Sequence, residues 1–237
     1  MKNKGEWRHW NDLLRNSEEK KVKNIRQMIV PTMDTVRTFY LLNLSIEHKR
    51  PVLFVGPTGT GKSAYVQSYL MSQLNKEEYM AFFVNFSAQT TANQVQDIFM
   101  SKLDKRRKGV FGPPMMRKAV FFVDDMNMPQ REKYGAQPPI ELLRMFVDHG
   151  YWYDKKDTTS FVLNDIQLVA AMGPPGGGRN PVTARFTRHF NLISVNPFND
   201  ETMTRIFSAV ISTYLKVNIH LYIQYTKKVK RRYTEYN

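Results

Sequence analysis

The sequence predicts an α/β fold in which a five-stranded parallel sheet lies between two layers of helices. Two observations support this expectation. Near-continuous apolar segments, typical of buried parallel strands, alternate along the chain with segments of helical periodicity. The 237 residues, 42% of them apolar, are also enough to bury one sizeable core, which excludes a disordered chain.

The first half of the chain is expected to supply three helices and two strands. A helix over residues 32–48 carries Asp34 near its start, where a carboxylate favours the helix dipole. A strand follows at 52–55, then a helix, a buried aromatic strand at 80–86 and a helix at 91–103. The expected buried faces of the three helices are Val36, Phe39, Tyr40 and Leu44; Val66, Tyr69, Leu70 and Leu74; and Val95, Ile98, Phe99 and Leu103.

The second half begins with the charge run 105–108 and a segment rich in Gly and Pro, which together favour a turn and a loop. Strands are expected at 119–123, 166–172 and 192–195, and a helix before Gly150, which ends it. Asn199 and Asp200 begin a last helix. One stripe on that helix holds Met203, Ile206, Phe207, Val210, Ile211, Tyr214 and Leu215, and needs a partner.

A glycine-rich segment typical of a nucleoside triphosphate site lies between the first strand and the helix that follows. It consists of Gly56, Pro57, Thr58, Gly59, Thr60, Gly61, Lys62 and Ser63. Glycines let successive backbone N–H groups converge on phosphate oxygens, and the helix that starts near Gly61 directs the positive end of its dipole toward them. In such a loop Lys62 reaches the β and γ phosphates, and Ser63 binds Mg²⁺. A glycine-rich turn without a ligand is the alternative, but every fixed position of the pattern is present.

Two carboxylates follow the strand at 119–123. Asp124, at the carboxyl end of that strand, is where a P-loop enzyme holds its Mg²⁺, although a strand-end Asp can also start a turn toward Pro129. Asp125 stands where a glutamate commonly polarises the attacking water. Because its side chain is one methylene shorter, by roughly 1.5 Å, its competence as a base is left open.

Two arginines precede the last strand. Arg185, with Arg188 as second choice, is a candidate for a guanidinium that projects into the nucleotide of a neighbouring module and stabilises charge on its γ phosphate. The alternative is a pair of solvent-facing cations near a helix end.

Composition narrows the possible compartments and partners. The chain has no cysteine, which excludes disulfides and thiolate chemistry, and no apolar run long enough to span a membrane, so we expect a soluble, intracellular protein without a membrane partner. The net charge of +14 invites a nucleic-acid partner, but residues 216–237 contribute +5 of it as a basic tail, which is usually a solvated end, so nucleic-acid binding is not favoured.

The expected organisation has four parts. Residues 1–27 form a charged connector with Trp7 and Trp10 as apolar anchors, and 28–199 form the nucleotide-binding α/β subdomain. Residues 200–216 begin a helical lid, and the tail at 217–237 is expected to be irregular.

With the phosphate loop, Val123-Asp124-Asp125 and the edge arginine in this order, the chain resembles an AAA+ ATPase module. It is most similar to the third AAA+ module of the axonemal dynein heavy chain ring. The segments that carry this resemblance are 29–37, 56–63, 122–129, 148–150, 165–175 and 176–181. It extends over about residues 6–215 and is specific, because the last two segments are not general to ATPases.

The resemblance implies a P-loop NTPase of AAA+ type that binds ATP or ADP with Mg²⁺. It implies that Val30, Pro31 and Thr32 line the adenine pocket, and that Arg185 serves the nucleotide of the preceding module. It further implies a regulatory site that gates neighbouring modules of a ring, indirect contact with microtubules, and a place in the cytoplasm, in the cytoskeleton of the ciliary axoneme. Because a complete motor does not fit in 237 residues, the chain is expected to be a fragment with a truncated lid.

Two departures from the family pattern bear on activity. Asp125 replaces the usual glutamate, and Gly173 stands where many AAA+ modules place a polar sensor asparagine. We therefore expect weak or regulatory hydrolysis. A nucleic-acid-dependent ATPase that uses residues 105–108 and the tail, and a non-hydrolysing module with a structural nucleotide, are the alternative functions.

Overall fold

The computed structural model describes residue 7, residues 9–15 and residues 28–216. These fall into two compact units. Residues 38–197 form the larger unit, and the described residues of 1–37 and 198–216 belong to the smaller one. The larger unit carries the phosphate loop.

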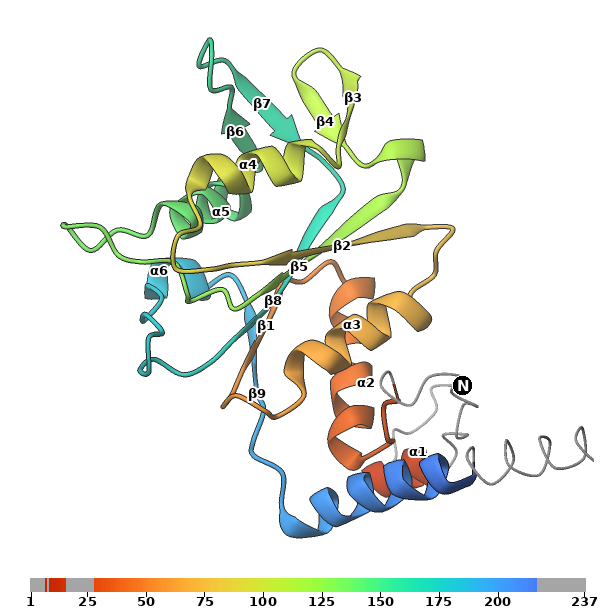
Figure 1. The fold of residues 1–237 in the computed structure, drawn as a ribbon. Helices are drawn as coiled ribbons and strands as arrows, with labels where there is room; N and C mark the ends of the chain where they lie inside the picture. The colour runs from red at the N-terminus through yellow and green to blue at the C-terminus, as the bar shows by residue number, and fades with distance from the viewer. Residues whose placement is uncertain (1–6, 8, 16–27, 217–237) are drawn as a thin grey trace, which may run out of the picture. The chain divides into compact units, whose positions relative to one another are not determined.

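The larger unit is built on a five-stranded parallel sheet, as the sequence predicts (Figure 1). Its strands, in spatial order, are β2 (Tyr79–Asn85), β5 (Lys118–Asp124), β8 (Ile166–Met172), β1 (Val52–Val55) and β9 (Asn191–Ser194). The bounds of β1 and β8 coincide with the expected strands, and the other three differ from expectation by one residue at each end. The register pairs Val55 with both Met172 and Ser194, so these strands end at one edge.

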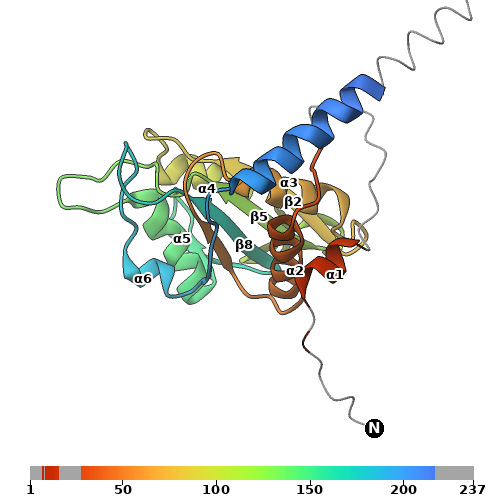
Figure 2. The same ribbon diagram turned by 90° about the horizontal axis from the view of Figure 1, so that it is seen from below.

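Helices cover both faces of this sheet. Helices α2 (Met33–Glu47) and α3 (Lys62–Ser72) lie on one face, and α4 (Ala92–Met100) and α5 (Pro138–His149) lie on the other (Figure 1). Figure 2 shows α2 and α5 on opposite sides of β8. Strand β5 contributes side chains to the hydrophobic clusters on both faces of the sheet, because successive side chains of a strand point to opposite faces. Val120 and Phe122 pack in the cluster under α2 and α3, and Ala119, Phe121 and Val123 pack in the cluster under α4 and α5.

A second sheet, which the sequence analysis missed, extends from the side of α4 and α5. Its four strands, in spatial order, are β3 (Asp104–Arg107), β4 (Val110–Gly112), β7 (Ser160–Leu163) and β6 (Tyr151–Tyr153). The sequence analysis did not expect a strand in the charge run 105–108, although the turn signalled by Gly109 is present, with φ of 71°. These charged residues form a hairpin with β4, and Arg106 pairs with Asp165 and donates to the backbone oxygen of Arg117 at 3.0 Å.

Helix ends follow the local chemistry of the sequence. Thr91 and Gln94 form a reciprocal capping box at the start of α4. Gly150, with φ of 75°, ends α5 as expected. A short 3-10 turn spans Pro114–Met116 and a single helical turn, α6, spans Ala184–Thr187.

The prediction of a buried side chain is wrong at three helix positions. Tyr40 and Leu44 of α2 are exposed, and the helix instead buries Leu42 and Ile46 against the sheet. Ile98 of α4 is also exposed, because the face of α4 that packs inward consists of Val95, Gln96 and Phe99. The Gln96 amide donates to the backbone oxygen of Tyr153 at 2.7 Å. Strand β2 is only partly buried, since it lies at an edge of the sheet.

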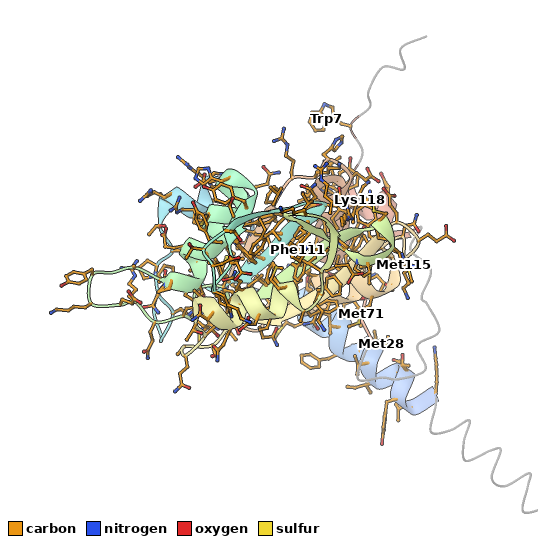
Figure 3. All side chains as sticks on the ribbon, turned by 90° about the horizontal axis from the view of Figure 1, so that it is seen from above. Trp7, Met28, Met71, Phe111, Met115 and Lys118 are labelled. Carbon is orange, nitrogen blue, oxygen red and sulfur yellow. The ribbon has the colours of Figure 1, made fainter. Side chains whose placement is uncertain are left out.

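The smaller unit contains α1 (Trp10–Arg15), the start of α2, and a helix over residues 200–216. Asn199 begins that last helix, since its side-chain oxygen accepts the Thr202 backbone N–H at 2.8 Å. Trp7, labelled in Figure 3, is fully exposed, so its ring packs on none of the described residues. The expected basic tail at 217–237 and most of the connector lie outside those residues.

Candidate nucleotide-binding site

The phosphate loop starts at the sheet edge where β1, β5 and β8 end. It leaves β1 after Val55 and leads into α3, whose first residue is Lys62. Gly61 is the residue before that helix and has φ of 76°, a left-handed conformation that glycine adopts without strain. The Thr60 hydroxyl donates to the Pro57 carbonyl at 2.9 Å, which closes the loop on itself. The expected strand-loop-helix arrangement is present.

The side chain of Lys62 folds back from the start of α3 into the phosphate loop. Its Nζ donates to the carbonyl oxygens of Gly56, at 2.8 Å, and Pro57, at 2.6 Å. Burial lowers the pKa of the Lys62 ammonium, and the nearby positive charge of Arg179 lowers it further, while Asp124 raises it. The ammonium is thus held on backbone carbonyls, at the position from which a P-loop lysine reaches phosphate oxygens.

A cavity of about 300 Å³ joins the loop to the strand ends. It is lined by Thr58, Gly59, Gly61, Lys62, Ser63, Ala64, Asp124, Asp125, Met172, Gly173 and Arg179. Most of the residues that the sequence predicts to bind phosphate and metal therefore meet in one place. The remaining loop residues position Lys62, whose ammonium donates hydrogen bonds to Gly56, Pro57 and Thr60.

The lining suits a magnesium-bound nucleotide. Ser63 and Asp124 offer a hydroxyl and a carboxylate, the oxygen donors that Mg²⁺ prefers. No group of three or more His, Cys, Asp or Glu that could hold a metal occurs in the described part of the chain. A set this small fits Mg²⁺, which takes one or two protein ligands and completes its shell with phosphate oxygens and water.

Asp125 turns away from the strand that leads to it. Its φ is 50°, and its backbone N–H donates to the Asp124 carboxylate at 3.0 Å. Its own carboxylate, about half exposed, lies 3.5 Å from an Nη2 atom of Arg179. Asp125 thus lies in the site, next to a cation that the sequence analysis did not count as a site residue.

Sequence reasoning missed Arg179 because it lies in a loop six residues after Gly173. The signal was the triplet Gly176-Gly177-Gly178 in front of it, since consecutive glycines permit a tight turn. All three have positive φ.

The proposed adenine segment, Val30, Pro31 and Thr32, directly precedes α2. The Thr32 hydroxyl accepts the Thr35 backbone N–H at 3.2 Å, and so caps that helix. These residues belong to the smaller unit, and their role toward a nucleotide stays a prediction.

The two candidate finger arginines have different surroundings. Arg188 donates to the Asp148 carboxylate at 3.1 Å, and His189 lies 2.7 Å from the same oxygen. Arg185 is exposed on α6 and forms no hydrogen bond or ion pair with the described residues. Of the two, only Arg185 is free to reach another protein without breaking an ion pair.

The residues proposed for nucleic-acid binding are only partly available. Arg106, in the middle of the run, is occupied by Asp165 and by backbone carbonyls, while Lys105 and Arg107 are exposed. As for membranes, none of the helices in the described residues combines the length and apolarity needed to cross one.

A phosphate loop, a buried lysine and a strand-end aspartate around one cavity, at the carboxyl edge of a parallel sheet, define a P-loop nucleotide-binding domain. Residues 17–198 match the family model described as P-loop containing dynein motor region. The chain belongs to this dynein motor family and is an ATP-binding AAA+ module.

Individual relatives agree with this assignment. The chain is 61% identical over 220 residues to "Dynein axonemal heavy chain 12" of Homo sapiens, which is 92% of this chain and 7% of that protein. It is 57% identical over 208 residues to "Dynein axonemal heavy chain 3" of Mus musculus, and 54% identical over 193 residues to "Dynein axonemal heavy chain 1" of Homo sapiens. These matches cover 87% and 81% of this chain, and 5% and 4% of the relatives.

Proposed function

We propose that this chain is the third AAA+ module of an axonemal dynein heavy chain, where it binds Mg²⁺ with ATP or ADP and regulates neighbouring modules of the motor ring. The observation that carries the proposal is the shared cavity of Lys62, Ser63 and Asp124 at the mouth of the phosphate loop. The names of the relatives support the axonemal part and a place in the cytoskeleton of the cilium. Contact with microtubules would be indirect, through the complete motor.

The residues of the site have separate tasks in this proposal. Lys62 and the loop amides hold the phosphates, and Ser63 and Asp124 hold Mg²⁺, which supplies charge neutralisation when bound. Asp125 would orient water, either directly or through a second water. The Asp125 carboxylate forms an ion pair with Arg179, and this ion pair would be lost when the carboxylate accepts a proton. This favours slow hydrolysis and a regulatory role.

Coupling between modules follows from the arginine that each module offers its neighbour. Arg185 projects from α6 and would stabilise charge on the nucleotide of the preceding module. The nucleotide of this module would need the corresponding arginine from the next one. Loss of the γ phosphate then removes a contact between modules, which is a two-state switch.

A steady-state ATPase assay of the purified chain tests this proposal. We expect nucleotide binding with little turnover, because the arginine that completes the site must come from another module. Rapid Mg²⁺-dependent turnover by the monomer would contradict the regulatory role. In a complete heavy chain, Lys62→Ala should leave ATP turnover at the principal site measurable but change the nucleotide dependence of microtubule release. An unchanged dependence would reject the gating function.

A further inference from the structure

The side chain of Arg179 enters the phosphate cavity from a loop that follows β8. It lines the cavity together with Lys62 and Asp125, and 23% of its side chain is exposed. Lys62 and Arg179 line the same cavity although they are 117 positions apart in the sequence. The cavity therefore holds two cations from this chain itself.

A tight turn fixes the backbone that carries Arg179. The Gly176 N–H donates to the Arg179 carbonyl at 3.0 Å, and the Arg179 N–H donates back to the Gly176 carbonyl at 3.1 Å. Gly177 and Gly178, between them, have φ of 57° and 84°. Positive φ at both central residues is the signature of a type I′ turn, in which a side chain on either flank has a defined direction.

A second set of contacts joins this turn to the loop that carries the carboxylates. The Asn127 side-chain amide donates to the Gly173 carbonyl at 2.8 Å, and the Asn180 backbone N–H donates to the Asn127 carbonyl at 2.9 Å. The Asn180 side chain also donates to the Pro129 carbonyl at 2.9 Å. These hydrogen bonds tie the turn of Arg179 to the segment that directly follows Asp124 and Asp125.

Gly173 makes the room for this arginine. A Cβ atom at position 173 would lie 2.5 Å from Nε and 2.6 Å from Cδ of Arg179, closer than such atoms approach in proteins. The missing side chain at position 173 and the buried arginine stem are therefore two parts of one arrangement. The polar side chain that many AAA+ modules place here would displace Arg179.

An ion pair with Asp125 uses only part of this guanidinium. The pair spans 3.5 Å and involves one Nη2 atom. The Nε atom is buried and has no hydrogen-bond partner among the described residues. A buried donor without a partner is costly, and an arginine has five N–H donors. A purely structural salt bridge would be expected to satisfy more of them.

We propose that Arg179 is the residue through which this module distinguishes ATP from ADP, by binding oxygens of the γ phosphate in place of the polar side chain that Gly173 lacks. The inference rests on the proposed nucleotide function. A planar guanidinium recognises a terminal phosphate better than a bridging one, because it can donate two parallel hydrogen bonds. Arg179 thereby couples the γ phosphate to Asp125, since the same guanidinium contacts that carboxylate.

Equilibrium titration with ADP and with a non-hydrolysable ATP analogue, both with Mg²⁺, tests the assignment. Arg179→Gln should weaken the analogue about ten- to a hundredfold, the effect of one or two charge-assisted hydrogen bonds, and ADP about threefold or less. Arg107→Gln, which removes an exposed arginine of β3, is the matched charge control and should change neither affinity. Equal weakening of both nucleotides by Arg179→Gln would overturn the proposal.

The same titrations in a protein that also carries Asp125→Asn show whether Arg179 binds the γ phosphate or only neutralises the charge of Asp125. If Arg179 only masks that carboxylate, Arg179→Gln will have no effect on the analogue once Asp125 is neutral. Our proposal predicts that the selective loss persists. Gly173→Ala should give a similar but smaller selective loss, because it displaces the arginine stem. Circular dichroism checks that each variant is folded.

The two proposals fail differently. No affinity of the unaltered chain for either nucleotide would reject the nucleotide function itself. Binding of both nucleotides, with an unchanged preference in the Arg179 variant, would reject only the role of Arg179.

Discussion

The Arg188 guanidinium lies 3.1 Å from Oδ1 of Asp148 and ties the short helix α6 to the last turn of α5. Arg144 holds the other oxygen of the same carboxylate at 2.7 Å. Asp148 therefore organises a small cluster of cations at the corner that carries Arg185. Arg188 therefore has a structural role, and Arg185 is the better candidate for the arginine that contacts the nucleotide of a neighbouring module.

The two arginines should respond differently to substitution. In a complete heavy chain, Arg185→Ala should lower ATP hydrolysis at the preceding module on the order of a thousandfold, as expected for loss of an arginine finger, with no change in thermal stability. Arg188→Ala should lower the melting temperature and reduce turnover far less. ATPase assays and thermal unfolding of both variants decide the matter, and the reverse pattern would assign the finger to Arg188.

Asp148 also predicts a dependence of stability on pH. Burial opposes its ionisation, but hydrogen bonds from Arg188 and Arg144 and the charge of His189 outweigh burial and lower its pKa. Its contribution is therefore present above the ordinary carboxyl pKa and is lost as the pH falls through the lowered value. Asp148→Asn should reduce the melting temperature at neutral pH, and the difference should vanish once the pH falls below the lowered pKa of Asp148. A difference that is constant across this range would contradict the account.

A longer carboxylate at position 125 should increase the rate of ATP hydrolysis. Asp125→Glu extends the carboxylate by roughly 1.5 Å, and we expect about a tenfold or larger increase in single-turnover hydrolysis, since a misplacement of about 1 Å can cost on the order of a hundredfold. Nucleotide affinity should change little. Asp125→Asn serves as the control, and equal rates for the Glu and Asn variants would show that position 125 takes no part in the chemistry.

The unexpected second sheet should matter for stability through Trp152. This side chain is fully buried, its ring lies 5.5 Å from that of Phe99, and its indole N–H donates to the Leu142 carbonyl at 2.8 Å. Trp152→Ala should reduce the free energy of unfolding by about 3–5 kcal/mol in denaturant titrations. The neighbouring Tyr153 is exposed, so Tyr153→Ala should cost about 1 kcal/mol or less. Similar losses for both would argue against Trp152 as a core residue.

The central sheet was predictable because each of its strands is a local signal. Residues 168–172 of β8 are a continuous apolar run, which is typical of a strand that is buried on both faces. The phosphate loop was predictable for a similar reason, since its chemistry is local and the hydrogen-bond partners of the Lys62 ammonium among the described residues lie within six positions of it.

Features that depend on distant pairing were not predictable. Strand β3 reads as a charge run, and it becomes a strand only because β4 pairs with it and Arg106 meets Asp165, 59 residues away. Helix α2 offers more than one apolar stripe, and only the packing against the sheet selects Leu42 and Ile46 over Tyr40 and Leu44. Arg179 reaches the site through a turn whose direction follows from tertiary hydrogen bonds.

Calorimetric titration of the folded chain with Mg²⁺ and ATP or ADP, before and after Lys62→Ala, tests the nucleotide site most directly. We predict saturable binding of both nucleotides by the unaltered chain and a loss of about a hundredfold or more in the variant, since a buried ammonium on the phosphates contributes about 3 kcal/mol. Lys76→Ala, at an exposed position, should bind like the unaltered chain. Absence of binding by the unaltered chain, or full affinity in the Lys62 variant, would contradict the account.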